Sequence, residues 1–498
     1  MNSNPLPVVV IGAGPVGLSA AAHLLERGLT PLILEAADLV GAGMLRWSHV
    51  RMFSPWRFTI DKAAARLLSD QGWIPPDTDA FPTGGEVVER YLRPLAATPA
   101  IAPHLRLRCR VIAVAKQGRD RMKDAKRGEA PFVVRYEDVH GEHELLAQAV
   151  IDASGTIESP NPLGASGLPA IGERGAQPHI FYGMPDVLGV HRERYAGKRV
   201  LVVGSGHSAF NVLSDLARLT QQSPATHIQW AIRRPSVQRV LGGGENDQLV
   251  ERGRLGMAIA RLVNEGALSV ATEFRLDRIE TTPGGLVAHS GSTALPAVDE
   301  IVAATGFRPD VELLSELRIA LDVATQSPVR LAPLIDPNLH SCGSVRPHGA
   351  EQLQHPDANV YIVGMKSYGR APTFLLLTGY EQVRSVVAAI AGDWESARRV
   401  ELVLPETGVC VTQFADEDGA AKAAASCCAS SALLVEETIT AAAPVEAASG
   451  CCGGPPKTLA DACCANDEQA KTAGASGCGC AAAASRVAAA PAPSTCCV

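Results

Sequence analysis

The sequence predicts an α/β protein in which one strand–helix–strand unit is inserted into another and a C-terminal tail follows. Two glycine-rich turns, near residues 12 and 204, each join an apolar strand to a helix. A third observation separates the tail, because no aromatic residue and no histidine occurs after residue 415. The expected parts are residues 1–175 and 309–412 for the outer unit, 176–308 for the inserted unit and 413–498 for the tail.

The outer unit begins with residues 8–35, VVVIGAGPVGLSAAAHLLERGLTPLILE. Four β-branched residues at 8–11 run into the turn GAGPVG at 12–17, and the helix formers that follow stop at Gly28, which suits a helix C-cap. The next apolar strand, expected at residues 31–34, ends in Glu35. Strand, glycine turn, helix, strand and terminal acid together are typical of a Rossmann-type dinucleotide-binding domain.

Each residue of this pattern has a physical role. Gly12 makes the tight turn, Gly14 lets the backbone approach a pyrophosphate, and Gly17 packs the helix against the strand. The helix N-terminus favours the phosphates, and Glu35 would accept a hydrogen bond from a ribose hydroxyl. Its carboxylate would repel a 2′-phosphate, so we expect FAD or NAD here rather than NADP. Such turns also occur without a ligand, but the flanking strands and the acid favour binding.

Length and composition exclude several classes of protein. With 498 residues and 46% hydrophobic content the chain can bury sizeable cores, and a net charge of −7 without a basic patch argues against a nucleic-acid partner. No stretch approaches the roughly 18 apolar residues of a membrane span. The apolar residues 6–11 lack a basic region before them and are interpreted as the first strand, not as a signal peptide. We expect a cytoplasmic protein.

The segment after Glu35, residues 41–58, is rich in Trp, Phe and Arg. It is either a buried loop or a lid over an adenine or flavin ring. Further expected elements are helices at 60–71, 85–95 and 372–391 and strands at 105–114, 132–139, 149–155, 298–307 and 359–364. The charged stretch 117–130 is interpreted as a solvated hairpin tip.

The inserted unit repeats the pattern at residues 198–216, KRVLVVGSGHSAFNVLSDL. Its three small-residue positions hold Gly204, Gly206 and Ala209. The next strand ends in Arg233 and Arg234, where the outer unit has an acid. Arginine there can pair with the 2′-phosphate of NADP, which would favour NADP over NAD by roughly 10- to 150-fold. The alternative is two arginines on a solvated turn.

The order of the motifs GAGPVG, DASG, GSGHSA, ATGFRPD and NVYIVG resembles that of flavoproteins with two dinucleotide-binding domains. It is similar in particular to the flavin-containing monooxygenases, over about residues 6–395. The resemblance implies FAD in the first glycine motif and NADPH in the second. Carried over, the FAD residues are Gly12, Gly14, Gly17 and Glu35, and the NADPH residues are Gly204, Gly206, Ala209 and Arg233, with Arg234 beside it.

One signature of that family, F-x-G-x-x-x-H-x-x-x-F/Y, is present only in stretched form. Seven residues separate Gly183 from His191, while Phe181 and Tyr195 keep their expected distances. This departure argues against a typical amine or ketone substrate. The stretches WSHVRMFSPW and KSYGRAPTFLL, together with the cysteine tail, resemble the flavin monooxygenases of arsenic-resistance gene clusters.

The disulfide reductases share this architecture but need a redox dithiol beside the flavin. No C-x-x-C motif occurs before the tail, and Cys109 and Cys342 are far apart in sequence. Lone buried cysteines are more often small core residues than nucleophiles. The last strand ends in Gly364 and Met365 instead of the Gly-Asp usual in disulfide reductases, which favours the monooxygenase interpretation.

The tail is rich in alanine, serine, glycine and proline and cannot bury enough apolar surface to offset its chain entropy, so we expect disorder. Ten of the thirteen cysteines occur there as five close pairs: Cys427 and Cys428, Cys451 and Cys452, Cys463 and Cys464, Cys478 and Cys480, and Cys496 and Cys497. Adjacent α-carbons lie about 3.8 Å apart, below the disulfide range of about 4.4–6.8 Å. Such dithiols select thiophilic metals or metalloids. The alternative is a low-complexity accident.

The sequence therefore predicts an NADPH-dependent FAD monooxygenase that uses O₂ to oxygenate a soft nucleophilic centre. Candidate substrates are trivalent arsenic or antimony species, which the cysteine tail would bind. One alternative is an NADPH-dependent flavoprotein reductase that acts on thiols or metal ions, and another is a non-enzymatic metalloid-binding chaperone on a flavoprotein scaffold. No catalytic acid or base is assigned, because His348, His355 and Tyr368 near the last strand are of a kind that is more often structural.

Overall fold

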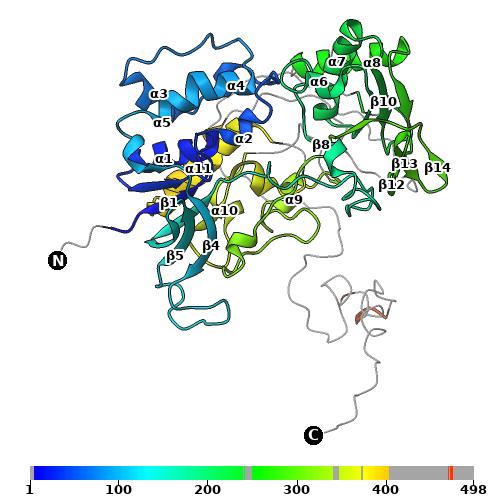
Figure 1. Cartoon of the computed structure of the whole chain (residues 1–498). Helices are drawn as coiled ribbons and strands as arrows, with labels where there is room; N and C mark the ends of the chain where they lie inside the picture. Colours follow the sequence, from blue (N-terminus) through cyan, green and yellow to red (C-terminus); the bar gives the residue numbers. More distant parts are fainter. Residues whose placement is uncertain are drawn as a thin grey trace. The chain divides into compact units, whose positions relative to one another are not determined.

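The computed structural model describes residues 5–238, 240–241, 250–339, 347–371, 374–402, 469 and 472–474 (Figure 1). The chain divides into two compact units, residues 1–420 and 421–498, and the elements described below belong to the first. Cys342, Cys410 and the ten tail cysteines all lie outside the described residues.

The first sheet has five parallel strands in the order β16-β7-β1-β2-β3, and we call its part of the chain the outer domain. The strands are β1 (Val8–Ile11), β2 (Pro31–Leu34), β3 (Leu105–Arg106), β7 (Ala149–Asp152) and β16 (Val360–Ile362). All four residues of β1 are buried, because both faces of the sheet are covered. Val8 and Val10 pack in one cluster with α1 (Pro15–Glu26) and α11 (Leu376–Ile390).

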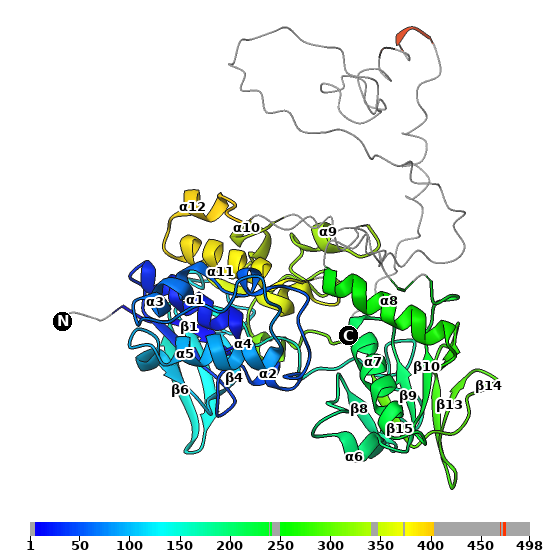
Figure 2. The ribbon, with the colours of Figure 1, turned by 90° about the horizontal axis from the view of Figure 1, so that it is seen from above.

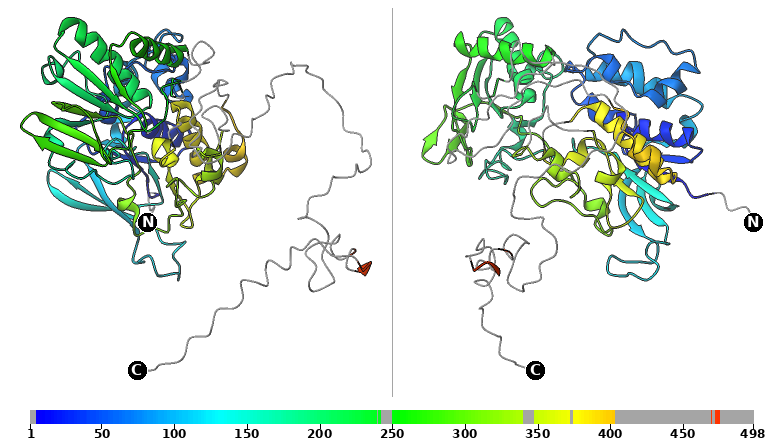
Figure 3. Two further views of the ribbon diagram at one scale, coloured as in Figure 1. Left: turned by 90° about the vertical axis from the view of Figure 1, so that its right-hand side faces the viewer. Right: turned by 180° about the vertical axis from the view of Figure 1, so that it is seen from behind.

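A three-stranded antiparallel sheet covers the other face of the outer domain. It consists of β4 (Arg110–Lys116), β5 (Phe132–Asp138) and β6 (Gly141–Ala147), and is drawn in cyan in Figure 3. Val9 and Ile11, the alternate residues of β1, pack in one cluster with Phe132 and Val134 of this sheet. The period of two along β1 thus divides its side chains between two cores.

The inserted domain is built on a second parallel sheet, in the order β11-β10-β9-β15-β8. Its strands are β8 (Ile180–Tyr182), β9 (Arg199–Val203), β10 (His227–Ala231), β11 (Ser269–Ala271) and β15 (Glu300–Ala303). One face packs against α7 (His207–Gln222), beside which α8 (Val250–Asn264) lies in Figure 2. The other face packs against β12 (Arg278–Thr282) and β13 (Gly285–Ser290), which pair with β14 (Thr293–Ala294).

Short helices connect these layers. They are α2 (Ala42–Leu45), η1 (Trp56–Phe58), α3 (Lys62–Ser69), α4 (Gly84–Val87), η2 (Val88–Leu92), α5 (Arg93–Ala96), η3 (Ala102–His104), η4 (Gln177–His179), α6 (Arg192–Tyr195), η6 (Glu312–Leu314), α9 (Ala332–Ile335), α10 (Ala350–Leu353), η7 (Gly364–Tyr368) and α12 (Trp394–Arg398). None of the helices in the described ranges is both long and apolar enough to cross a membrane.

The predicted fold class, two Rossmann-type domains with the second inserted into the first, is confirmed by these sheets. Three details differ from the sequence expectation. The strand expected at 105–114 is interrupted, because Arg108 adopts a φ of 55°. The helix expected at 85–95 contains the π-helical turn η2, and the strand β6 was not expected.

The interpretation of residues 117–130 as a purely solvated hairpin tip is wrong. Arg127 is buried and donates from Nε and Nη2 to the two carboxylate oxygens of Asp357, at 2.8 and 2.7 Å. It also donates to the carbonyl oxygens of Asp120 and Glu316. The five N–H donors of arginine allow it to be buried when a carboxylate and several carbonyl groups surround it. This arginine anchors the hairpin to the segment that precedes β16.

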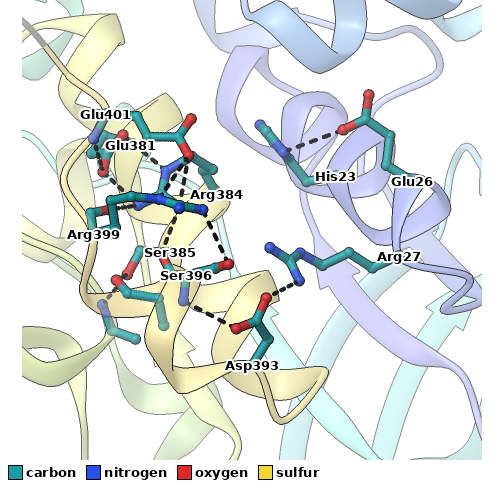
Figure 4. Close-up of polar contacts among 12 residues, drawn as sticks. His23, Glu26, Arg27, Glu381, Arg384, Ser385, Asp393, Ser396, Arg399 and Glu401 are labelled. Atoms are coloured by element: carbon teal, nitrogen blue, oxygen red, sulfur yellow. Dashed lines mark hydrogen bonds and ion pairs between the residues drawn. The ribbon is translucent and has the colours of Figure 1, made fainter.

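Polar contacts also join the last helices to the first (Figure 4). Arg27, at the end of α1, donates to Asp393 at 3.0 Å, and Asp393 caps α12 by accepting from the Ser396 amide. On α11, Arg384 pairs with Glu381 at 2.7 Å and donates to the Ser396 carbonyl at 2.9 Å. The C-terminal helices are therefore attached to the helix that follows the first glycine turn.

His355 lies in the outer domain at the amino end of β16, opposite the end that carries the glycine turn. Its Nδ1 accepts from the Ala320 amide at 3.3 Å, and its side chain is buried. Burial lowers the pKa of His355 to about 4. The imidazole is therefore neutral at physiological pH and takes part in packing.

This pKa predicts a pH-dependent loss of stability. The unfolded chain protonates His355 near pH 6.5 and the folded chain only near pH 4, so stability present above pH 6.5 is lost as the pH falls through this interval, by about 3 kcal/mol. His355→Gln cannot bind the proton and should lose less stability between about pH 7 and about pH 4.5 in urea unfolding. The exposed residue His227 provides the control His227→Gln, which should behave like the unmodified protein. Equal losses in the His355→Gln variant and the unmodified protein would contradict the prediction.

Candidate functional site

The first glycine turn lies at the carboxyl end of β1, and its three glycines have different surroundings. Gly12 has a φ of +98°, a conformation that favours glycine. A Cβ at Gly17 would lie 2.0 Å from the carbonyl oxygen of Gly12, so any side chain there would push α1 away from the strand. Among the described residues, nothing lies within 4 Å of the Cβ position of Gly14, which leaves this side of the turn open. These differences fit the roles expected for the three positions.

Glu35 follows β2 and is held beside the same turn. One carboxylate oxygen accepts from the Ala13 amide at 2.6 Å and the other from the Ala37 amide at 2.9 Å. A carboxylate has about four lone-pair sites, so two amide bonds leave sites for further donors such as ribose hydroxyls. The two amides fix the orientation of the carboxylate.

A buried ion pair that sequence reasoning missed lies at the neighbouring strand ends. Asp152, the last residue of β7, accepts from Lys366 Nζ at 2.6 Å, and both side chains are almost fully buried. Lys366 also donates to Ser154 Oγ at 3.0 Å, and this hydroxyl donates to the other oxygen of Asp152 at 2.6 Å. The sequence did contain a signal for this ion pair, because the apolar strand AVID ends in an acid, Asp152. A buried carboxylate requires a partner.

Lys366 belongs to η7, which is positioned by a buried polar network. Gln382 on α11 accepts from the Gly364 amide at 2.7 Å and donates to Ser367 Oγ at 2.9 Å. The His348 ring lies within hydrogen-bond distance of Gln382 and 5.5 Å from the ring of Tyr368. Burial raises the pKa of Tyr368. His348 and Tyr368 thus take part in the packing around η7.

The second glycine turn repeats the geometry of the first. Gly204 has a φ of +133°, and a Cβ there would lie 2.3 Å from the carbonyl oxygen of Ala304. The Cβ position of Gly206 is open within 4 Å, and Ala209 is fully buried in the core. Trp230 on β10, which sequence reasoning missed, donates from Nε1 to the Gly204 carbonyl at 2.7 Å and fixes the turn.

Three arginines gather beyond the carboxyl end of β10. Arg233 donates to the Ala165 carbonyl at 3.3 Å. The segment that carries Arg275 is joined to the same loop, because the Phe274 amide donates to Ile232 and the Glu273 amide donates to Arg234. Desolvation lowers the pKa of Arg233, and the charges of Arg234 and Arg275 lower it further. Such a group of guanidinium ions favours a ligand with two negative charges. Arg275 was missed because it follows a different strand.

The stretched signature ahead of the second turn brings two of its residues into contact. The rings of Phe181 and His191 meet edge to face, 4.9 Å apart. His191 Nδ1 accepts from the Asp186 amide at 3.1 Å, and burial lowers the pKa of His191. The longer loop is therefore accommodated without separating the two rings. Tyr195 is fully buried in the core of the inserted domain.

Cys109 is the one cysteine within the described ranges. It is buried, its thiol donates to the Leu107 carbonyl at 3.4 Å, and burial raises its pKa. A thiol with a raised pKa is a poor nucleophile. The predicted tail ligands, Cys427, Cys428, Cys451, Cys452, Cys463, Cys464, Cys478, Cys480, Cys496 and Cys497, lie outside the described residues.

Comparison with known structures identifies the fold. A bacillithiol disulfide reductase from Bacillus cereus has a TM-score of 0.55 at 19% identity, covering 78% of this chain and 99% of that one. The FAD-bound structure of DfoA, a cadaverine monooxygenase from Erwinia amylovora, also has a TM-score of 0.55, at 17% identity, covering 82% of this chain and 99% of that one. The same fold therefore carries both a reductase and a monooxygenase.

Among curated proteins, the chain is similar to the indole-3-pyruvate monooxygenase YUCCA1 of Oryza sativa, at 29% identity over 220 residues. This match covers 42% of the chain and 45% of the relative, so the chain spans about half the length of this protein. A ferredoxin–NADP reductase from Ignicoccus hospitalis is 24% identical over 315 residues, which cover 62% of this chain and 80% of that one.

The family model described as pyridine nucleotide-disulphide oxidoreductase matches residues 9–341, more than half of the chain. This match covers both glycine turns, Glu35 and the arginines after β10. It confirms the expected enzyme class, an oxidoreductase that works with a pyridine nucleotide. The chain belongs to the pyridine nucleotide-disulphide oxidoreductase family.

Proposed function

We propose that this protein is an NADPH-dependent FAD monooxygenase. The observation that carries the proposal is the opposite charge at equivalent places in the two domains. Glu35 follows the strand next to the first glycine turn, whereas Arg233 and Arg234 follow the strand next to the second. An acid there suits a ribose hydroxyl and arginine suits a 2′-phosphate, so the two turns are suited to different dinucleotides.

The residues present fit both cofactors. FAD would lie at the first turn, where Gly14 is open and the N-terminus of α1 provides amides for phosphates. NADPH would lie at the second turn, beside Gly206, with its 2′-phosphate on the arginines. Bound FAD would supply the redox chemistry, accepting hydride from NADPH and reacting with O₂. Residues 1–175 and 309–412 would form the FAD domain and 176–308 the NADPH domain.

The family description names disulphide oxidoreductases, whereas two features of this chain favour an oxygenase over a reductase. A disulfide reductase passes electrons through a dithiol, and the cysteine in the described residues is a buried thiol with a raised pKa. Gly364 is followed by Met365, where disulfide reductases usually carry an acid, and then by the buried Lys366. Both features favour direct oxidation by O₂ over electron transfer to a disulfide.

The oxygenase proposal predicts a strict need for O₂. Each turnover would consume one NADPH, one proton and one O₂, insert one oxygen atom into the substrate and release the other as water. Substrate oxidation should therefore stop under anaerobic conditions, while a single reduction of the bound flavin by NADPH should remain. Stopped-flow absorbance under argon and under air measures both steps. Continued anaerobic turnover with a thiol or metal-ion acceptor would instead support the reductase alternative.

The nucleotide preference tests the assignment of the arginines. The protein should use NADPH in preference to NADH, by roughly 10- to 150-fold in kcat/KM, because one charge-assisted hydrogen bond contributes about 1.5–3 kcal/mol. Arg233→Ala should narrow this ratio and leave kcat/KM with NADH unchanged. The matched control is Arg278→Ala, since Arg278 lies on β12 and contacts His289 instead. If the unaltered protein uses both nucleotides equally, the assignment of Arg233 is wrong.

We further propose that the substrate is a trivalent arsenic or antimony species. The support is the composition of residues 413–498, where five close cysteine pairs offer soft ligands. Oxygenation would raise the metalloid from the +3 to the +5 state, which is a two-electron oxidation. The four electrons that O₂ accepts would thus come in equal shares from the metalloid and from NADPH. A tethered dithiol raises the local concentration of such an ion near the flavin. The protein would work in the cytoplasm, where its thiols stay reduced.

Removal of the tail tests this part separately. Truncation after residue 414 should leave flavin reduction by NADPH unchanged, weaken arsenite binding and raise the arsenite KM several-fold. Calorimetric titration with arsenite and steady-state kinetics measure the two effects. A full-length variant with serine at the ten tail cysteines controls for the loss of the polypeptide itself. Equal arsenite binding by all three proteins would eliminate the tail as the capture device, and metalloid binding without any NADPH-linked oxidation would favour the chaperone alternative.

A further inference from the structure

Residues 49–53 of the outer domain face helix α7 of the inserted domain. The rings of Phe53 and His207 meet edge to face, 5.1 Å apart. Farther along α7, burial raises the pKa of Asp215, and the charges of Arg218 and His49 oppose this rise, which places His49 near Asp215. His49 and Phe53 thus lie near two positions of α7 that are about two helical turns apart. We call this contact the α7 seam.

A cleft of about 240 Å³ opens along the α7 seam. Its lining comes from both domains and comprises Arg51, Phe53, Asn211, Glu251, Arg254 and Leu255. Asn211 lies one turn after His207, to whose carbonyl it donates at 3.0 Å, and the open glycine Gly206 directly precedes α7. The cleft is therefore next to the second dinucleotide turn but distinct from the arginines after β10.

Among the described residues that line the cleft, two guanidinium ions stand against one carboxylate, so their summed charge is positive. Arg254 donates from Nη1 to Glu251 at 2.6 Å, and Arg51 donates from Nη1 to the Phe81 carbonyl. Among the described residues, each guanidinium thus gives one nitrogen to a partner, which leaves several N–H donors for a ligand. Forked N–H donors suit the oxygen atoms of phosphate-like ions.

The volume limits the size of the ligand. The cleft has a volume of about 240 Å³. Pockets for whole cofactors and drug-sized ligands span about 300–1,000 Å³. The cleft is suited to one small charged group, not to an entire dinucleotide.

We propose that this cleft binds a tetrahedral oxyanion between Arg51 of the outer domain and Arg254 of the inserted domain. The oxyanion is either a phosphate of bound NADPH or a free ion such as phosphate or arsenate. The NADPH source rests on the proposed function, whereas binding of a free ion does not. In either case the anion joins the two domains, because its ligands come from both.

Calorimetric titration of the flavin-loaded protein with sodium phosphate, sodium arsenate and NADP⁺ tests the site without turnover. Arg51→Ala and Arg254→Ala should each weaken binding of the occupant by roughly tenfold. The Arg51→Lys variant should bind with intermediate strength, since lysine keeps the charge but lacks the forked N–H donors of arginine. Glu251→Gln should strengthen binding, because it removes the carboxylate found among the described lining residues. Arg261→Ala on the exposed part of α8 and Arg46→Ala before the segment are matched controls that should change nothing.

The variants distinguish the two sources of the ion. If Arg51→Ala and Arg254→Ala bind NADP⁺ more weakly, and free phosphate competes with NADP⁺ for the cleft, the bound oxyanion is a phosphate of the dinucleotide. Weaker phosphate or arsenate binding with unchanged NADP⁺ binding identifies a free oxyanion, and this result stands even if the protein is no monooxygenase. Unchanged binding of all three ligands in variants that keep the thermal unfolding midpoint would overturn the proposal. If either alanine variant fails to fold, the stronger oxyanion binding expected for Glu251→Gln tests the proposal instead.

Discussion

The close approach of backbone segments at each glycine turn is the constraint on which both domains depend. At Gly17, on α1, a methyl group would lie 2.0 Å from the carbonyl oxygen of Gly12, and at Gly204 it would lie 2.3 Å from the carbonyl oxygen of Ala304, which follows the neighbouring strand β15. Neither obstacle is a flexible side chain, so a substitution would have to move the helix or the strand. The approach places the N-termini of α1 and α7 beside the carboxyl ends of β1 and β9, where backbone amides favour phosphate groups.

The two glycine turns have similar geometry, but the charged residues beside them differ in sign. Glu35 is held by two backbone amides beside the first turn, whereas Arg233, Arg234 and Arg275 gather beyond the second. Without a partner, the buried Asp152 would place a negative charge at the strand ends, beside which a dinucleotide at the first glycine turn would lie. Lys366 neutralises it at 2.6 Å, so the carboxylate can orient Ser154 without repelling a diphosphate. The ion pair thereby keeps the outer site compatible with an anionic cofactor.

The parts of this architecture that sequence could predict are those encoded locally. Glycine spacing, apolar strands and the residues that end them lie within about 30 residues of one another in a βαβ unit, and the predicted strand at 31–34 agrees with β2 to the residue. Lys366 pairs with an acid 214 positions earlier, and Arg275 joins Arg233 only because β10 and β11 are neighbours. Arg127 looked like one charge among many on a polar hairpin, and only the fold brings Asp357 to it. Contacts of this kind depend on topology, which local patterns do not encode.

The outer and inserted domains are attached to each other at two places. Hydride transfer requires reacting atoms about 3–3.5 Å apart, so two sites on separate sheets need contacts that orient one domain against the other. One attachment is at the linkers, where the Asn161 side chain donates to Thr305 at 3.1 Å and accepts from Arg308 at 2.9 Å. A linker alone would act as a hinge and leave rotation about it possible. The α7 seam provides a second attachment, distant in sequence from the first, through Phe53 and His207. The seam contact opposes this rotation, and side chains on the seam are therefore placed to influence how two bound dinucleotides would meet.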